Sequence, residues 1–171
     1  MRRITDYLLA DHERLSSLLA AATSRPEFDR DSFAEFRAGL LRHIGIEEKV
    51  LFPAARRARG GEPLSRAHAL RIEHAALTSL MVPTPNAALC AEIASILHGH
   101  DAVEEGPSGV YAECEAVLGE ADSAALLATA RAFPAVPTSR HFDGPTAHRT
   151  AASALASAAK ISPPRREKVS V

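Results

Sequence analysis

The chain has few of the residues on which small secreted or membrane proteins depend. It has no tryptophan, and aromatic residues make up 5% of its 171 residues. Its two cysteines, Cys90 and Cys114, are too few for a disulfide framework and form no Cys-x-x-Cys motif. No apolar run approaches the roughly 18 residues of a membrane-spanning helix, and the first residues lack the apolar core of a signal peptide. We therefore expect a soluble cytoplasmic protein with no membrane partner.

An excess of charge of one sign is also missing. Twenty basic residues stand against 21 acidic ones, for a net charge of −1. Because nucleic-acid binders usually carry a marked basic excess, we expect no nucleic-acid partner. The balance hides a division: residues 1–133 hold 14 basic and 19 acidic residues, whereas residues 134–171 hold six basic and two acidic ones.

Apolar residues recur at helical spacing, and no segment shows sustained strand alternation. We predict that Thr5 or Asp6 caps a first helix. Asp29 or Asp31 should cap a second helix, which bends or ends near Phe52-Pro53 and is closed by Gly60-Gly61. A third helix should have Pro63 in its first turn, and a fourth should meet Gly106-Pro107. Beyond it, residues 108–118 are predicted to be helical, and Asp122 or Ser123 to cap a fifth helix that reaches about Phe133.

Four long helices with short connections predict an all-α fold, an up-down-up-down four-helix bundle with an additional helix, over residues 1–133. Residues 134–171 are rich in proline, alanine and serine and poor in large apolar residues. We interpret them as a loosely attached basic tail with one alanine-rich helix near residues 146–160. Docking of this tail on the acidic body or on a protein partner is the alternative.

The two halves of the predicted bundle repeat one another. Residues 11–18 and 73–80 both read acid-His-x-x-Leu-(Ser/Thr)-Ser-Leu, and residues 40–48 and 97–105 both contain His-x-x-x-Glu-Glu. Such self-similarity indicates a duplicated helix pair. Four of the eight histidines of the chain occupy matching positions in the two halves of the repeat.

The repeat places six polar residues on the apolar faces of four helices, because residues four apart share a helix face. These residues are His12, His43, Glu47, His74, His100 and Glu104. Burying carboxylates and imidazoles without compensation is costly, and a metal, mutual pairing or solvent entry would compensate. Six such residues in one repeat favour a metal. Imidazole with carboxylate suits iron, manganese or zinc better than calcium or magnesium.

With these residues, the sequence resembles the hemerythrin-like family, also called HHE cation-binding domains. The resemblance covers roughly residues 4–118 and includes the Glu-Glu pairs that end the two repeats. It implies a non-haem di-iron centre with the first two histidines on one iron and the last two on the other. The two glutamates would bridge both irons, and an oxo or hydroxo group would complete the bridge.

The sequence departs from the oxygen-carrying hemerythrins at two points. Those proteins have a third histidine on one iron, which lies on the third helix four residues from the histidine already there. In this chain the residue four after His74 is Thr78. Their second carboxylate comes five residues after its histidine, which corresponds to Glu105. We prefer Glu104 because it mirrors Glu47, and Glu105 stays the alternative. The chain is therefore similar to the symmetric His, His-x-x-x-Glu, His, His-x-x-x-Glu subgroup.

Fewer protein ligands leave more positions open to exogenous ligands. This weakens reversible oxygen carriage and favours chemistry with peroxide or nitric oxide. We expect a di-iron protein that binds or turns over O2, H2O2 or NO, with catalase-like peroxide dismutation as its enzymatic version and no catalytic residue beyond the metal ligands. A sensing module that conveys its state through the tail is the alternative, and a metal-free helical scaffold is a third.

The remaining histidines have simpler interpretations. His98 lies about 200° around its helix from His100, so we expect it at the surface or beside the ligands. His68 is expected to be solvated, and His141 and His148 lie in the tail.

Four further polar residues lie close to the repeat. We interpret Glu48 and Glu105 as solvated or as partners that hold an imidazole N–H. Tyr7 is off the face of His12. Tyr111 lies beyond the predicted helix break, where it could approach the site, although packing is our preferred interpretation.

Overall fold

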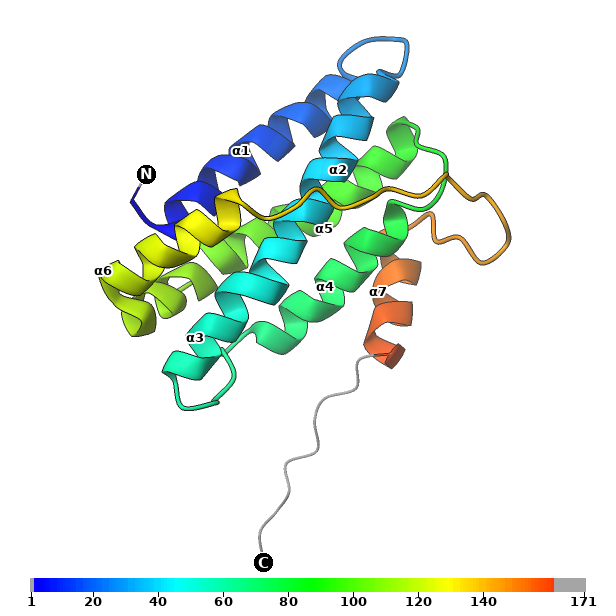
Figure 1. Cartoon of the computed structure of the whole chain (residues 1–171). Helices are drawn as coiled ribbons and strands as arrows, with labels where there is room; N and C mark the ends of the chain where they lie inside the picture. The colour runs from blue at the N-terminus through cyan, green and yellow to red at the C-terminus, as the bar shows by residue number, and fades with distance from the viewer. Residues whose placement is uncertain (1, 162–171) are drawn as a thin grey trace, which may run out of the picture.

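The computed structural model describes residues 2–161, and every regular element within this range is helical (Figure 1). The elements are α1 (Ile4–Thr23), α2 (Arg30–Ile46), the π-helical turn η1 (Glu47–Leu51), α3 (Phe52–Ala58), α4 (Ala67–Leu80), α5 (Ala87–Glu105), α6 (Val110–Arg131) and α7 (Ala151–Ile161). Helices α1, α2, α4 and α5 alternate in direction and confirm the predicted bundle. None of the described helices combines the length and apolarity needed to cross a bilayer.

The predicted cap of the first helix is wrong. Thr5 and Asp6 lie inside the first turn of α1, not in front of it. The Asp6 carboxylate accepts the backbone N–H groups of Arg2 and Arg3 and so holds the segment that precedes the helix. The Thr5 hydroxyl is buried and donates to Glu115 of α6 at 2.7 Å.

The second helix is capped as predicted, by Asp29, whose carboxylate accepts the N–H of Ser32 at 3.0 Å. It does not end at Phe52-Pro53, because η1 joins α2 to α3 in one helical rod. Within η1 the N–H of Phe52 donates to the carbonyl of Glu47, five residues earlier. Pro53 has no N–H, so it could not continue an α-helical ladder at this point. Single π turns of this kind are frequent at functional sites.

Two other predicted boundaries differ from the structure. Pro63 precedes α4, which begins at Ala67, and does not lie in its first turn. Ser123 lies within α6, after a break at Gly119 whose φ of 70° favours glycine. The Ser123 hydroxyl accepts the N–H of Ile4 at 3.2 Å and thereby satisfies a free donor of α1.

The apolar core is divided into two clusters along the bundle axis. On α1, Leu8 belongs to one cluster and Leu15 to the other, and His12 lies between them. On α4, Leu70 and Leu77 are divided in the same way. The predicted polar residues therefore occupy a layer between two apolar layers.

A strap (residues 132–150) crosses the bundle after α6 and leads to α7, which packs on α4 and α5 (Figure 1). Helix α7 confirms the predicted alanine-rich helix and buries Ala154 against the body. The expectation of a loose attachment is wrong for the described part of the segment. Small alanine side chains let α7 approach the body closely, and residues 162–171 of the predicted tail lie outside the described residues.

Hydrogen bonds to the backbone groups of the strap hold it in place. The guanidinium of Arg37, on α2, donates to the carbonyl of Ser139 at 2.9 Å. The N–H of Phe142 donates to the carbonyl of Val82, between α4 and α5, at 2.9 Å. The strap is thus fixed to both halves of the bundle.

Arg42 joins α2 to the end of α6. Its guanidinium donates to the carbonyls of Ala130 and Phe133 at 2.8 and 3.1 Å, and to the hydroxyl of Tyr7 at 2.7 Å.

Arg42→Met should lower the free energy of unfolding by about 1–3 kcal/mol, because partly buried carbonyls lose a charged donor. Urea denaturation measures the change. Arg30→Met, at an exposed position of α2, is the matched control, and an equal loss in both variants would contradict the prediction.

Candidate metal centre

The six predicted residues come together in two buried clusters. One consists of His12, His43, Glu47 and Glu104, and the other of Glu47, His74, His100 and Glu104. Within each cluster the potential ligand atoms all lie within 4.8 Å of one another. None of the six residues is more than 7% exposed. Both glutamates belong to both clusters, which is the arrangement expected of a centre that holds two metal ions.

Helical spacing positions the two histidine–glutamate pairs. His43 Nε2 lies 3.4 Å from Glu47 Oε1, and His100 Nε2 lies 3.4 Å from Glu104 Oε2. The equal distances follow from the same spacing of four residues in the two halves of the repeat. His12 and His74 reach the same layer from the neighbouring helices α1 and α4.

Each of the four histidines places Nδ1 against a carboxylate of another helical segment. The pairs are His12 with Glu105 at 2.6 Å, His43 with Asp11 at 3.1 Å, His74 with Glu48 at 3.0 Å, and His100 with Glu73 at 2.8 Å. An ionised carboxylate only accepts hydrogen bonds, so each Nδ1 carries the proton. Each Nε2 then faces the cluster, where it can bind either a second proton or, as a lone pair, a metal.

The carboxylate partners follow the twofold repeat. Asp11 and Glu73, which precede the first histidine of each half, hold the second histidine of the same half. Glu48 and Glu105 hold the first histidine of the opposite half, which is one of the two roles expected for them. Sequence reasoning missed the role of Asp11 and Glu73, although the acid before each histidine is a visible part of the repeat.

Facing lone pairs provide the test of whether a metal fits. His12 Nε2 and His43 Nε2 are 2.9 Å apart, and His74 Nε2 and His100 Nε2 are 3.2 Å apart. With both Nδ1 atoms protonated, these nitrogens repel unless a proton or a metal cation lies between them. One oxygen each of Glu47 and Glu104 is also buried without a hydrogen-bond partner. Converging nitrogens and unpartnered carboxylate oxygens fit a pair of metal ions.

The electrostatics of the clusters favour positive charge. Burial opposes protonation of His43, but the carboxylates of Glu47, Asp11 and Glu104 together outweigh it and raise the pKa of His43 to about 10. Burial also opposes protonation of His74, but the nearby carboxylates of Glu47 and Glu48 raise its pKa to about 9. Burial and the charge of Glu47 raise the pKa of Glu104. A bound metal would replace these protons as the source of positive charge.

Tyr111, in the first turn of α6, packs in the apolar core, as preferred from the sequence, and its hydroxyl also reaches the clusters. Its hydroxyl donates to Glu47, and lies 3.2 Å from Glu104 Oε2 and 3.3 Å from His12 Nε2. Burial and the negative charge of Glu47 raise its pKa well above the usual range, so the phenol keeps its proton. Gly109 permits this placement, because any Cβ there would collide with the carbonyl of Glu104.

A cavity of about 280 Å³ between α1, α2 and α5 reaches the clusters from one side. His12, His43 and His100 form part of its lining. His98 is exposed at this cavity and joins neither cluster, as expected. Half-buried Asp101 also lines it. A small molecule therefore has a route to three of the four cluster histidines.

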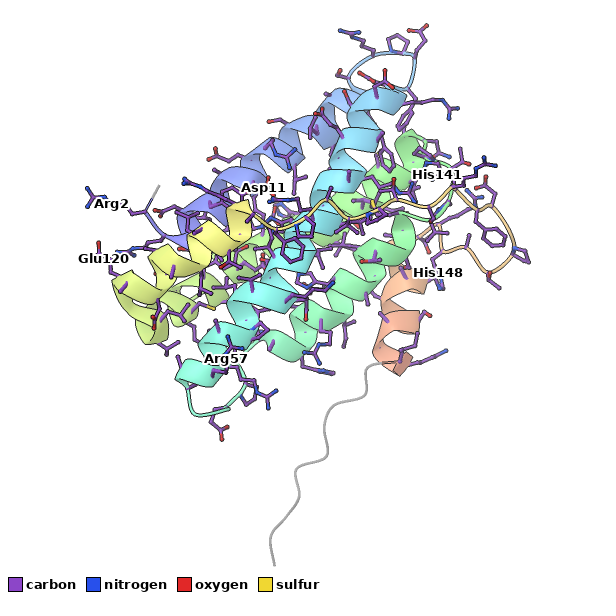
Figure 2. All side chains as sticks on the ribbon, viewed as in Figure 1. Arg2, Asp11, Arg57, Glu120, His141 and His148 are labelled. Atoms are coloured by element: carbon purple, nitrogen blue, oxygen red, sulfur yellow. The ribbon has the colours of Figure 1, made fainter. Side chains whose placement is uncertain are left out.

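The other histidines lie away from the clusters. His68 is exposed, as predicted. In Figure 2, His141 and His148 lie in the strap, apart from Asp11 on α1. Tyr7 accepts a hydrogen bond from Arg42 and belongs to neither cluster.

The clusters and their helices match a known family. The model for the hemerythrin HHE cation binding domain matches residues 3–107. The chain is a member of the hemerythrin HHE family. The six cluster residues come from α1, α2, η1, α4 and α5 of the HHE domain, whereas Tyr111 comes from α6, after the matched segment. Comparison with curated proteins and with solved structures gives no significant match.

The geometry of the HHE domain favours Glu104 over Glu105 as the second shared carboxylate. Glu104 is fully buried in both clusters, whereas Glu105 is 40% exposed and contacts His12 Nδ1.

Glu104→Ala should abolish loading of a metal pair, because both sites lose a ligand. Glu105→Ala should keep two sites with affinity reduced about 10- to 100-fold, the usual effect of losing an orienting partner. Metal-to-protein ratios from mass spectrometry measure both, and the reverse order would assign the bridge to Glu105.

Proposed function

We propose that this HHE domain is a non-haem di-iron protein that binds or turns over a small oxidant, O2, H2O2 or NO, with peroxide dismutation as its reaction. The observation that carries the proposal is the cavity that opens on His12, His43 and His100. It reaches clusters that have only two imidazoles each and share two carboxylates. Two histidines with carboxylate and open positions suit non-haem iron.

Six residues would hold the two ions. His12 and His43 would bind one iron, His74 and His100 the other, and Glu47 and Glu104 both. When bound, the iron pair supplies the capacity to exchange two electrons with a small oxidant. Manganese and zinc accept the same donors, so metal analysis of the purified protein distinguishes them.

The residues of the chain control access to the clusters and the hydrogen bonds made there. Leu15 and Leu40 are buried in the wall of the cavity, whose volume of about 280 Å³ admits small molecules. Tyr111 lies outside the lining of this cavity and keeps its proton at the shared carboxylates, where it would donate only to a molecule that reaches them. The carboxylates behind the imidazoles keep every Nε2 directed inward.

Sensing without catalysis is the second candidate function, and the position of α7 favours it. This helix packs on α4, which carries His74, and on α5, which carries His100. A shift at these histidines would reach α7, through which a partner protein would read it. Rapid gas release after peroxide addition supports the enzyme. Inertness toward peroxide, with a ligand-dependent change in hydrogen exchange at α7, supports the sensor.

Iron content and peroxide consumption test the main proposal together. The full chain expressed with iron should contain an iron pair and evolve oxygen from peroxide. His43→Ala should lower iron content and abolish most oxygen release, because one cluster loses an imidazole. His68→Ala, at an exposed position outside the clusters, is the control and should match the unchanged protein. Absence of metal in the unchanged protein would leave only a helical scaffold.

Tyr111→Phe tests the role of the hydroxyl at the clusters. It should retain the iron pair but slow peroxide turnover about tenfold or more, since a positioned hydrogen-bond and proton donor is lost. Tyr7→Phe removes a hydroxyl that faces Arg42 and should leave turnover unchanged. Oxygen-electrode rates normalised to bound iron measure the effect. Equal normalised rates in the two variants would show that the Tyr111 hydroxyl has no role in turnover.

A further inference from the structure

A second cavity, of about 390 Å³, lies beside His74 and shares no lining residue with the first. It is enclosed by η1, α3, the loop before α4, and α4 itself. Phe52, Pro53 and Leu64 provide apolar lining. Its volume falls within the range of about 300–1,000 Å³ typical of small-molecule sites.

Three arginines belong to the lining of the same cavity: Arg56, Arg57 and Arg71. Among the described residues, neither Arg56 nor Arg57 has a carboxylate partner within ion-pair distance. The Arg56 Nε donates to the carbonyl of Gly61 at 2.6 Å, which fixes one edge of the cavity. Figure 2 shows Arg57 on α3 at the periphery of the molecule. This concentration of positive charge is local, because residues 1–133 as a whole are acidic.

Glu48 is the acidic residue of the lining, and it is already engaged. One of its oxygens accepts the Nδ1–H of His74 at 3.0 Å. The other lies 3.8 Å from the Arg71 Nε, too far for a hydrogen bond. Arg71 therefore keeps donors free for a second anion.

The lining also contacts the metal centre. The ring of Phe52 lies parallel to the imidazole of His74, with centroids 6.3 Å apart and an interplanar angle of 5°. Glu48 and Phe52 both line the cavity and both touch His74. A molecule in the cavity would rest against the two side chains that orient this histidine.

We propose that this cavity binds a small organic anion, a carboxylate or phosphate group on an apolar body. The anionic group pairs with Arg57 and Arg71, since the planar guanidinium matches carboxylate and phosphate oxygens. The apolar body lies on Phe52 and Leu64. This site is formed by residues outside the metal clusters and does not require a bound metal.

Calorimetric titration of the full chain with phenyl phosphate and with benzoate tests the site and separates the two anionic groups. At least one of them should bind saturably. Benzyl alcohol, which has the body without the charge, and inorganic phosphate, which has the charge without the body, should each bind on the order of tenfold more weakly. Equal binding of benzyl alcohol would overturn the proposal.

Arginine variants locate the binding. Arg57→Gln and Arg71→Gln should each weaken it about tenfold, the usual effect of losing a charged hydrogen bond. Arg66→Gln, at an exposed position outside the cavity, should leave it unchanged. All three positions are exposed, so these variants should fold, which circular dichroism checks. Unchanged affinity in both cavity variants would overturn the proposal.

Removal of metal separates this site from the metal centre, which could also attract anions. After chelation, binding should persist with the same sensitivity to Arg71→Gln. Loss of binding on chelation, without sensitivity to the arginine variants, would assign the anion to the metal and overturn the inference. A chain that contains no iron yet still binds phenyl phosphate would retain this site while refuting the di-iron proposal.

Discussion

The hydrogen bond from each cluster imidazole to a carboxylate is the interaction on which the rest of the structure depends. Asp11 links α1 to α2, Glu48 links η1 to α4, Glu73 links α4 to α5, and Glu105 links α5 back to α1. The four bonds form a closed ring around the bundle. They offset part of the cost of burying imidazoles and force every Nε2 inward, so the same bonds hold the helices together and shape the metal centre.

Local spacing explains why the six cluster residues could be predicted. His43 with Glu47 and His100 with Glu104 depend only on helical geometry, and the repeat supplies the remaining histidines. Tyr111 could not be placed in this way. Its approach depends on the direction of the chain after Gly106-Pro107 and on the close contact that Gly109 allows. Such tertiary relations leave no periodic signal.

Composition was a poor guide to contacts made by backbone groups and small side chains. The scarcity of large apolar residues after residue 133 predicted a loose tail, yet the strap is held by hydrogen bonds such as that from Arg37 to Ser139. Likewise, the hydroxyl of Ser123 could cap its own helix, but it accepts the N–H of Ile4 at the start of α1 instead. A cap motif indicates which hydrogen bonds a side chain can make, and tertiary structure decides which donor it meets.

The π turn η1 positions residues of two sites, the metal clusters and the cavity lined by arginines. It begins at Glu47, which belongs to both metal clusters, and ends just before Phe52, which stacks on His74 and lines the arginine cavity. Successive residues of a helix are rotated by about 100° around its axis. Loss of a single residue from this turn would rotate the whole of α3 by that angle relative to α2. Phe52 and the arginines of α3 would then leave their positions together, so a change in chain length at this point alters both sites at once.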